Sequence, residues 1–173
     1  MWVESSVGLG STFHFTIHTR AADGATDADL YQEQQQLAGK RLLVVDDYDF
    51  HRHIVRHYAQ TWGMQIRDTA SSAEALDWLQ QGESFDFALL DMHLPEMDAM
   101  TLATRIQAYG GANAPTCILL TAPGGRITLD NADYAQQDRV AFLSRPIKPA
   151  ALLQVLTTVS SGERVAPLPT PPA

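Results

Sequence analysis

Short apolar runs alternate with longer amphipathic segments over most of the chain, from residue 40 to residue 161. Each run has the length of a strand that is buried on both faces, and the segments between the runs are long enough for helices. Repeated strand–helix units predict an α/β fold, with a doubly wound five-stranded parallel sheet and helices on both faces. The predicted strands cover 42–45, 64–69, 85–90, 116–120 and 140–144, and the predicted helices cover 50–62, 72–81, 100–109, 129–137 and 150–160.

Capping residues mark several of these helix ends. Gly63 and Gly82 follow the first two helices, where a glycine often ends a helix. Ser71 or Ser72 is positioned to cap the second helix, and Asp49 is a candidate cap for the first. These signals support the predicted boundaries.

The segments outside this pattern differ in character. Residues 1–5 and 12–17 are predicted strands of an N-terminal β-hairpin, with Phe13, Phe15 and Ile17 on one face. A helix from Ala28 to Ala38 is a further expectation within the polar segment that follows. We divide the chain into the hairpin region 1–20, a linker at 21–39, a domain at 40–161 and a proline-rich tail at 162–173.

The composition restricts the class of protein. The formal net charge of −8 argues against nucleic acid as the main partner, because phosphate backbones need a basic surface. The single cysteine, Cys117, excludes an internal disulfide, fits a reducing compartment and is expected to be inert inside a buried strand. No apolar run is long enough to cross a bilayer. We therefore expect this piece to be cytoplasmic and to make no membrane contact, although its parent chain can be membrane-anchored.

Charged and polar side chains follow four of the predicted strands. Asp46 and Asp47 follow the first strand, Asp91 the third, Thr121 the fourth and Arg145 the fifth. Ligands of open parallel sheets bind at the carboxyl ends of the strands, so these groups meet at one edge. Three neighbouring carboxylates need a cation, and an oxygen-only set suits Mg²⁺. A carboxylate beside such a metal can attack phosphorus, and the hydroxyl and the guanidinium can bind phosphoryl oxygens.

Three segments, 42–47, 89–98 and 119–122, resemble the signature segments of response-regulator receiver domains. The resemblance covers 40–161 and implies a five-stranded flavodoxin-like fold that accepts a phosphoryl group from a phosphohistidine with Mg²⁺. The roles it implies are the acidic pair Asp46 and Asp47, the phosphoacceptor Asp91, the switch hydroxyl Thr121, the backbone carbonyl of His93 as a further metal ligand, and Phe142 as the aromatic residue whose rotamer reports activation.

Two residues depart from the family pattern. The family has lysine before the proline at the end of the last strand, and this chain has Arg145 before Pro146. Arginine keeps the charge but is bulkier and not equivalent to lysine, and Lys148 is expected to lie too far along the chain to replace it. Ala99 stands where the family usually has glycine, and it would be strained if that position needs a positive φ. The resemblance also implies a cis peptide before Pro146.

The N-terminal hairpin carries a second resemblance. Residues 2–5 and 8–15 are similar to the last two strands of the ATP-binding domain of sensor histidine kinases. The order of kinase end, linker and receiver is that of a hybrid histidine kinase, and we hypothesise that the chain is a piece of one. The piece lacks the nucleotide-binding motifs and the substrate histidine, so it is not expected to be an enzyme. The implied partners are a kinase phosphohistidine domain, in the same parent chain or another, and a histidine phosphotransfer protein.

Two other functions compete with the phosphoacceptor. A pseudo-receiver would hold a partner without being phosphorylated, and Arg145 is the feature that favours it. A hydrolase with an aspartyl nucleophile is disfavoured because His93 stands where such enzymes usually have a second aspartate. The first helix also carries His51, His53 and His57, which we interpret as a polar face and a candidate docking surface for a partner helix.

Overall fold

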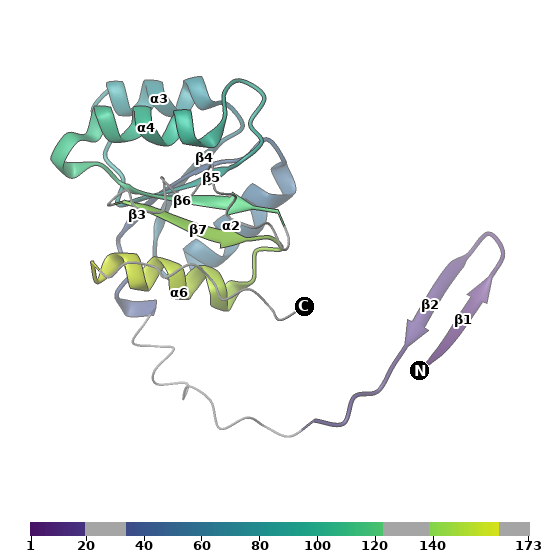
Figure 1. Ribbon diagram of the computed structural model, residues 1–173. Coiled ribbons are helices and arrows are strands. Elements are labelled where there is room, and N and C mark those ends of the chain that lie inside the picture. The colour runs from purple at the N-terminus through teal and green to yellow at the C-terminus, as the bar shows by residue number, and fades with distance from the viewer. Residues whose placement is uncertain (20–33, 123–138, 163–173) are drawn as a thin grey trace, which may run out of the picture.

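A five-stranded parallel sheet forms the centre of the computed structural model, which describes residues 1–19, 34–122 and 139–162 (Figure 1). The strands lie in the order β4-β3-β5-β6-β7, so the predicted flavodoxin-like fold is confirmed. The predicted helix at 129–137 and residues 28–33 of the helix expected from Ala28 to Ala38 lie outside the described residues. The strands are β3 Arg41–Val45, β4 Gln65–Thr69, β5 Phe87–Asp91, β6 Thr116–Thr121 and β7 Val140–Ser144, and the helices are α2 Asp49–Thr61, α3 Ser72–Gln80, α4 Ala99–Gly110, the 3₁₀ turn η1 Gly111–Asn113 and α6 Pro149–Ser160.

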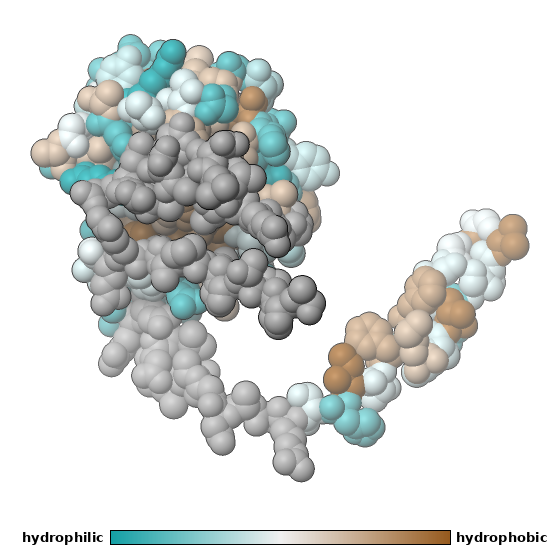
Figure 2. All heavy atoms as spheres, viewed as in Figure 1, coloured by the Kyte–Doolittle hydropathy of each residue, from teal (hydrophilic) through white to brown (hydrophobic). Residues whose placement is uncertain are grey.

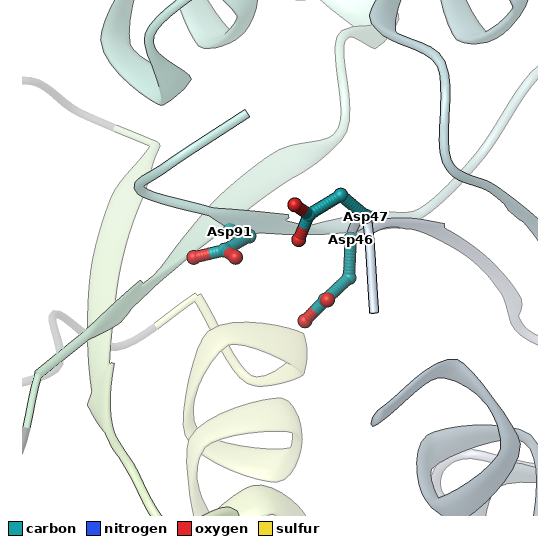
Figure 3. Close-up of side chains that lie close together, drawn as sticks. All are labelled: Asp46, Asp47 and Asp91. Carbon is teal, nitrogen blue, oxygen red and sulfur yellow. The ribbon is translucent and has the colours of Figure 1, made fainter. Parts of the chain in front are cut away.

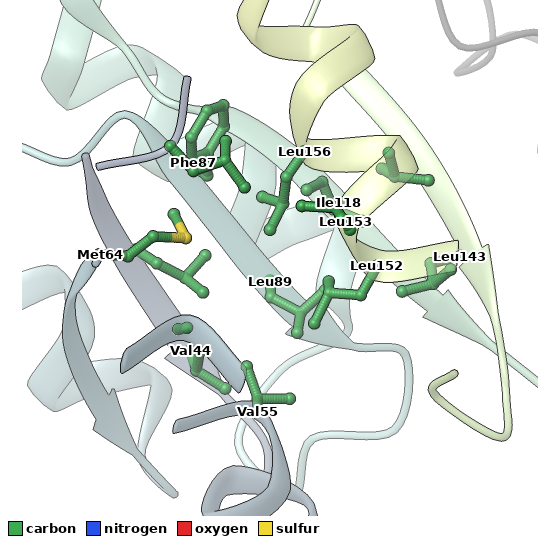
Figure 4. Close-up of a cluster of buried hydrophobic side chains, with 14 of the residues drawn as sticks. Val44, Val55, Met64, Phe87, Leu89, Ile118, Leu143, Leu152, Leu153 and Leu156 are labelled. Atoms are coloured by element: carbon green, nitrogen blue, oxygen red, sulfur yellow. The ribbon is translucent and has the colours of Figure 1, made fainter. Parts of the chain in front are cut away.

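Helices cover both faces of this sheet. Figure 1 shows α3 and α4 on one side and α2 and α6 on the other. Successive strand residues point to opposite faces, so Leu42 and Val44 pack under α2 and α6 while Leu43 and Val45 pack under α3 and α4. Figure 4 shows part of the first layer, which includes Val55 of α2 and Leu152 of α6. Burial on both faces explains why the central strands are continuous apolar runs.

The helix caps are those predicted from the sequence, except at the start of α2. Ser71 caps α3 and accepts a hydrogen bond from the Glu74 N–H at 3.3 Å, and Gly63 follows α2 with a φ of 72°. The proposal that Asp49 caps α2 is wrong: Tyr48 is the cap residue, without a side-chain hydrogen bond, and Asp49 lies in the first turn. There its carboxylate pairs with Arg52 at 2.9 Å and still complements the helix dipole.

The predicted N-terminal hairpin is present, and it is apolar on its surface. Strands β1 Trp2–Ser6 and β2 Gly10–His14 are antiparallel, with Trp2 opposite His14, and the second strand ends before the expected Ile17. The rings of Trp2 and His14 stack at 4.7 Å. Figure 2 shows brown apolar residues over the hairpin. Its exposed large apolar side chains include Trp2, Val3, Val7, Leu9, Phe13, Phe15 and Ile17.

Packing of the domain begins before its first strand. Leu37 is fully buried in the layer under α2 and α6, although it belongs to residues 21–39, the segment interpreted as a linker. Cys117 is buried, as expected, and so are Trp62 and Trp78. Burial raises the pKa of the Cys117 thiol to about 12. No helix in the described part of the chain is both long and apolar enough to cross a membrane.

Leu89→Ala is predicted to lower the free energy of unfolding by about 2–5 kcal/mol. Leu89 is fully buried on β5, two residues before Asp91, and truncation leaves a cavity under α2 and α6. Urea unfolding followed by tryptophan fluorescence measures the change. The control is Leu9→Ala in the exposed hairpin turn, which should leave the transition unchanged. Equal effects of the two substitutions would contradict this account of the core.

Candidate functional site

Three aspartates meet at the carboxyl edge of the sheet. Strands β3 and β5 are neighbours with Val45 opposite Leu90, so the next residues, Asp46 and Asp91, emerge side by side. Both are buried, at 1% and 3% exposure, whereas Asp47 is exposed. One ligand oxygen from each carboxylate lies within 4.8 Å of the others, and Figure 3 shows the three groups gathered there. The sequence-based prediction that these side chains come together is confirmed.

The Asp46 carboxylate is held by three donors. Its Oδ1 accepts a hydrogen bond from the Tyr48 N–H at 2.8 Å. The His51 ring places Nδ1 at 3.3 Å from Oδ1 and 3.1 Å from Oδ2. The Arg145 guanidinium reaches Oδ2 with Nη2 at 3.2 Å. A buried carboxylate needs such partners because desolvation disfavours an unpaired charge.

Arg145 bridges the two buried carboxylates. The same nitrogen, Nη2, lies 2.7 Å from Asp91 Oδ1 and 3.2 Å from Asp46 Oδ2. The Arg145 N–H donates to the Thr121 carbonyl at 2.9 Å, which ties the end of β7 to the end of β6. The peptide before Pro146 is cis, as the resemblance implied. The Nε atom of Arg145 is buried and has no hydrogen-bond partner in the described part of the chain. The arginine in the family's lysine position therefore does reach the site.

The loop after Asp91 is fastened at several points. The His93 N–H donates to Asp91 Oδ1 at 3.2 Å, and Leu94 is buried beneath the loop. The Glu96 carboxylate accepts hydrogen bonds at the start of α3, from the Ala73 N–H at 2.9 Å and from the Ser71 hydroxyl at 2.8 Å. These bonds hold the pKa of Glu96 below its ordinary value. The loop is thus anchored to the start of α3.

The loop ends at the cap of α4. Asp98 accepts from the Thr101 hydroxyl at 2.6 Å and from the Thr101 N–H at 2.9 Å, and these bonds lower the pKa of Asp98. Ala99 is the first residue of α4, and no non-glycine residue in the described ranges has a positive φ. The strain considered for Ala99 therefore does not occur.

Thr121 and Phe142 are the remaining predicted residues, and among the described residues they make no polar contact with the three carboxylates. Thr121 ends β6, one residue beyond Leu120, which is opposite Asp91. Within the part of the chain that the structure describes, the Thr121 hydroxyl makes no hydrogen bond to the three aspartates. Phe142 is half-buried on β7 and packs against the layer under α3 and α4. Their roles as switch residues stay predictions.

His51 is the site residue that the sequence did not identify. It was grouped with His53 and His57 on a polar helix face, yet only those two are exposed, and His51 turns toward Asp46. Its position in the first turn of α2, five residues after Asp46, is a signal that could have found it. His51 and Arg145 also line a pocket of about 340 Å³ beside the site, together with Phe50, Ile54, Pro146 and Ile147.

The donor set fits a hard divalent cation. All candidate ligands are carboxylate oxygens, and two of the three carboxylates are buried. The Arg145 guanidinium and the His51 ring lie next to their negative charge. Mg²⁺ prefers a small number of carboxylates and completes its shell with water or phosphate oxygens. A carboxylate, a hydroxyl and a cation at one sheet edge are the groups that the formation of an aspartyl phosphate requires. A flavodoxin-like fold with these groups at its carboxyl edge is typical of receiver-type phosphoacceptors.

Comparison with known proteins gives the family. The response regulator receiver domain matches residues 42–157, so the chain belongs to this family. It is a phosphoacceptor receiver domain of a two-component phosphorelay, with an acidic pocket formed by Asp46, Asp47 and Asp91.

Similar proteins include sensor kinases and a magnesium-bound receiver. The aerobic respiration control sensor protein ArcB of Escherichia coli (strain K12) is 26% identical over 155 residues, which are 89% of this chain and 19% of ArcB. Hybrid signal transduction histidine kinase L of Dictyostelium discoideum is 27% identical over 72% of this chain and 7% of its own length. The chain thus spans a fifth or less of these relatives. The receiver domain of sensor histidine kinase PA1611 from Pseudomonas aeruginosa PAO1, solved with a magnesium ion in its active-site cleft, has a TM-score of 0.59 at 23% identity and covers 73% of this chain and 100% of that one.

Asp98→Ala is predicted to lower the free energy of unfolding by about 1 kcal/mol at neutral pH, because it removes the cap of α4. Folding lowers the pKa of Asp98, so its carboxylate stabilises the folded protein at pH values above the ordinary aspartate pKa of about 3.9. This stabilisation is lost as the pH falls through the pKa that Asp98 has in the folded protein. The difference between the two proteins should therefore shrink in acid. Asp98→Asn is the control, because it keeps an accepting oxygen without a charge. Chemical denaturation across pH measures both, and a pH-independent difference would contradict the assignment.

Proposed function

We propose that Asp91 takes a phosphoryl group from a phosphohistidine, with Mg²⁺ held by Asp46, Asp47, Asp91 and the backbone carbonyl of His93. One observation carries the proposal: two buried carboxylates, Asp46 and Asp91, lie beside an exposed third at the carboxyl edge of the sheet. The match of the receiver family to residues 42–157 supports it independently.

Of the two buried carboxylates, Asp91 is the better nucleophile. Both oxygens of Asp46 already contact donors, from Tyr48, His51 and Arg145. Asp91 Oδ1 accepts a hydrogen bond from the His93 N–H and forms an ion pair with Arg145, while its Oδ2 accepts no hydrogen bond from the described residues. That oxygen keeps its lone pairs for the attack on phosphorus.

The transfer forms one bond and breaks one. Asp91 Oδ2 forms the new O–P bond, and the P–N bond of the donor breaks with its electron pair remaining on the imidazole, which then takes a proton from water. Bound Mg²⁺ supplies charge neutralisation for the phosphoryl oxygens. The Thr121 hydroxyl and the Arg145 guanidinium lie at the same edge, so we assign them to the phosphoryl oxygens of the product. The rotamer of Phe142 is the proposed reporter of this change.

The donor approaches over the start of α2. Tyr48 and Phe50 are 58% and 60% exposed, and Phe50 lines the pocket that His51 and Arg145 share with the site. An apolar rim around a reactive group suits the helix that bears a phosphohistidine, in a kinase or in a histidine phosphotransfer protein. His53 is exposed on the same helix and extends this docking surface.

The hairpin extends the proposal to the parent protein. The similarity to ArcB covers 89% of this chain, more than residues 42–157 can provide, so it includes sequence outside the receiver. The exposed apolar side chains of β1 and β2 need a cover that the hairpin alone does not supply. Both observations support the hairpin as the end of a kinase ATP-binding domain in a hybrid histidine kinase. This chain itself is proposed to have no kinase activity.

Incubation with Mg²⁺ and a small-molecule phosphodonor is predicted to add one phosphoryl group, detected by intact mass. Asp91→Asn should abolish the addition because it removes the attacking carboxylate. The control is Asp49→Asn, which alters an exposed carboxylate in the first turn of α2, outside the group of three, and should leave the addition unchanged. Phosphorylation that persists in Asp91→Asn would contradict the assignment.

The same measurement separates the competing pseudo-receiver. A folded wild-type protein that gains no mass and binds no Mg²⁺ would favour a binding module that works without phosphorylation. Arg145→Lys would then be the informative reversion, because it restores the family's residue at the site.

Removal of residues 1–19 is predicted to leave the free energy of unfolding of the receiver unchanged within about 0.5 kcal/mol, as for surface changes. Nearly all side chains of the hairpin are exposed, so little packing is lost. Removal of residues 1–38 is the matched control, and it should destabilise the domain because it deletes the buried Leu37. Thermal and urea unfolding give both values. A large loss with the shorter deletion would mean that the hairpin belongs to the receiver.

A further inference from the structure

We propose that Arg52 is a positioning residue of the acidic pocket, and that it acts on the metal ligands through the backbone between them. Its guanidinium orients the peptide group that joins Asp46 to Asp47, and this peptide group sets the direction of the Asp47 carboxylate. The inference rests on the proposed function of the site, because Mg²⁺ is the ion that these carboxylates are proposed to hold. It concerns the affinity for the metal rather than the bond formed at Asp91.

Arg52 contacts three different parts of the fold. It lies in the first turn of α2, and its side chain is 14% exposed. Its Nη1 donates to the Asp46 carbonyl oxygen at 2.6 Å, and its Nη2 donates to the Asp49 carboxylate at 2.9 Å. Its Nε lies 3.3 Å from the Asp68 carboxylate on β4. Because a guanidinium is planar and its donors point in fixed directions, three acceptors hold it in one orientation.

The hydrogen bond to Asp46 falls on the backbone between two candidate metal ligands. The Asp46 carbonyl oxygen belongs to the planar peptide group that ends at the Cα atom of Asp47. On the other side of the same residue, the Asp46 N–H donates to the Thr69 carbonyl at 3.2 Å. Asp46 is therefore held from both ends, by β4 and by Arg52. A rotation of the peptide group after Asp46 would break the Arg52 hydrogen bond and turn the Asp47 side chain.

The Asp47 carboxylate depends on this backbone more than the other two carboxylates do. It is exposed, and it makes no hydrogen bond or ion pair with the described residues. One of its oxygens nevertheless lies within 4.8 Å of ligand oxygens of Asp46 and Asp91. Since no side chain directs it, its place in the group follows from the backbone that carries it. Groups that orient metal ligands in this way strengthen metal binding without touching the ion.

Arg56 shows what Arg52 would do if it only stabilised the fold. It lies one turn further along α2 and binds the same Asp68 carboxylate, with Nε at 3.0 Å and Nη2 at 2.6 Å. Both arginines thus tie α2 to β4, but among the described residues only Arg52 donates to the Asp46 carbonyl. The structural role is shared and the positioning role is not, so Arg56 supplies a matched control.

The test is Mg²⁺ titration without a phosphodonor, followed by backbone amide chemical shifts, on the wild type, Arg52→Met and Arg56→Met. Methionine keeps an unbranched apolar stem and removes every donor. Arg52→Met should weaken Mg²⁺ binding by about tenfold or more, as the loss of a group that orients metal ligands commonly does. Arg56→Met should leave the affinity unchanged. Arg52→Lys, which keeps one donor of similar reach, should recover part of the lost affinity.

The rate of phosphorylation gives a second readout, which a general loss of stability would not reproduce. It is measured by intact mass at increasing Mg²⁺ concentrations. Arg52→Met should need more Mg²⁺ to reach half of its maximal rate, while the maximal rate stays close to that of the wild type, because the contacts of Arg52 do not include Asp91. A lower maximal rate with an unchanged half-saturating Mg²⁺ concentration would contradict the proposal.

Two further outcomes would overturn it. One is an unchanged Mg²⁺ affinity in Arg52→Met whose folding is verified by circular dichroism, and the other is an equal loss of affinity in Arg56→Met. Arg52→Gln, whose shorter side chain removes the Nη1 donor, carries the same prediction should Arg52→Met fold poorly. A wild type that binds Mg²⁺ but gains no mass from a phosphodonor would refute the proposed function alone, because the Mg²⁺ titrations of the variants remain interpretable.

Discussion

Two buried carboxylates that lie side by side must be compensated by positive charge, and the whole carboxyl edge of the sheet is organised by this constraint. Asp46 and Asp91 are almost completely excluded from solvent, and their negative charges repel. Arg145 spans both of them, and His51 faces Asp46. Any divalent cation enters a site that already contains a cation. Metal binding, phosphoryl binding and the position of Arg145 are therefore parts of one electrostatic balance.

The fold delivers these groups to one place. Parallel strands that are buried on both faces end at the same edge, and β3 lies next to β5 although α2, β4 and α3 separate them in the chain. Rigid packing under the strands fixes the two aspartates. The loop after Asp91 is fastened by the Glu96 hydrogen bonds to α3 and by the Asp98 cap of α4. These hydrogen bonds hold the loop after Asp91 in position next to the phosphoacceptor.

The sequence predicted the parts of this arrangement that follow from periodicity. Alternating apolar runs and amphipathic segments gave the five strands, and the residues after the strands gave the acidic group and Arg145. It did not predict features that depend on side-chain direction. His51 shares a helix with exposed histidines, and only the tertiary structure shows that its ring turns to Asp46. Leu37 was assigned to the linker because the few apolar residues of that polar segment show no period, yet its side chain is fully buried.

The central claim is tested most directly by crystals soaked in Mn²⁺, which shares oxygen ligation with Mg²⁺ and gives an anomalous signal. The account predicts one anomalous peak bounded by oxygens of Asp46, Asp47 and Asp91. Peaks only elsewhere in the crystal, with this position empty, would contradict it.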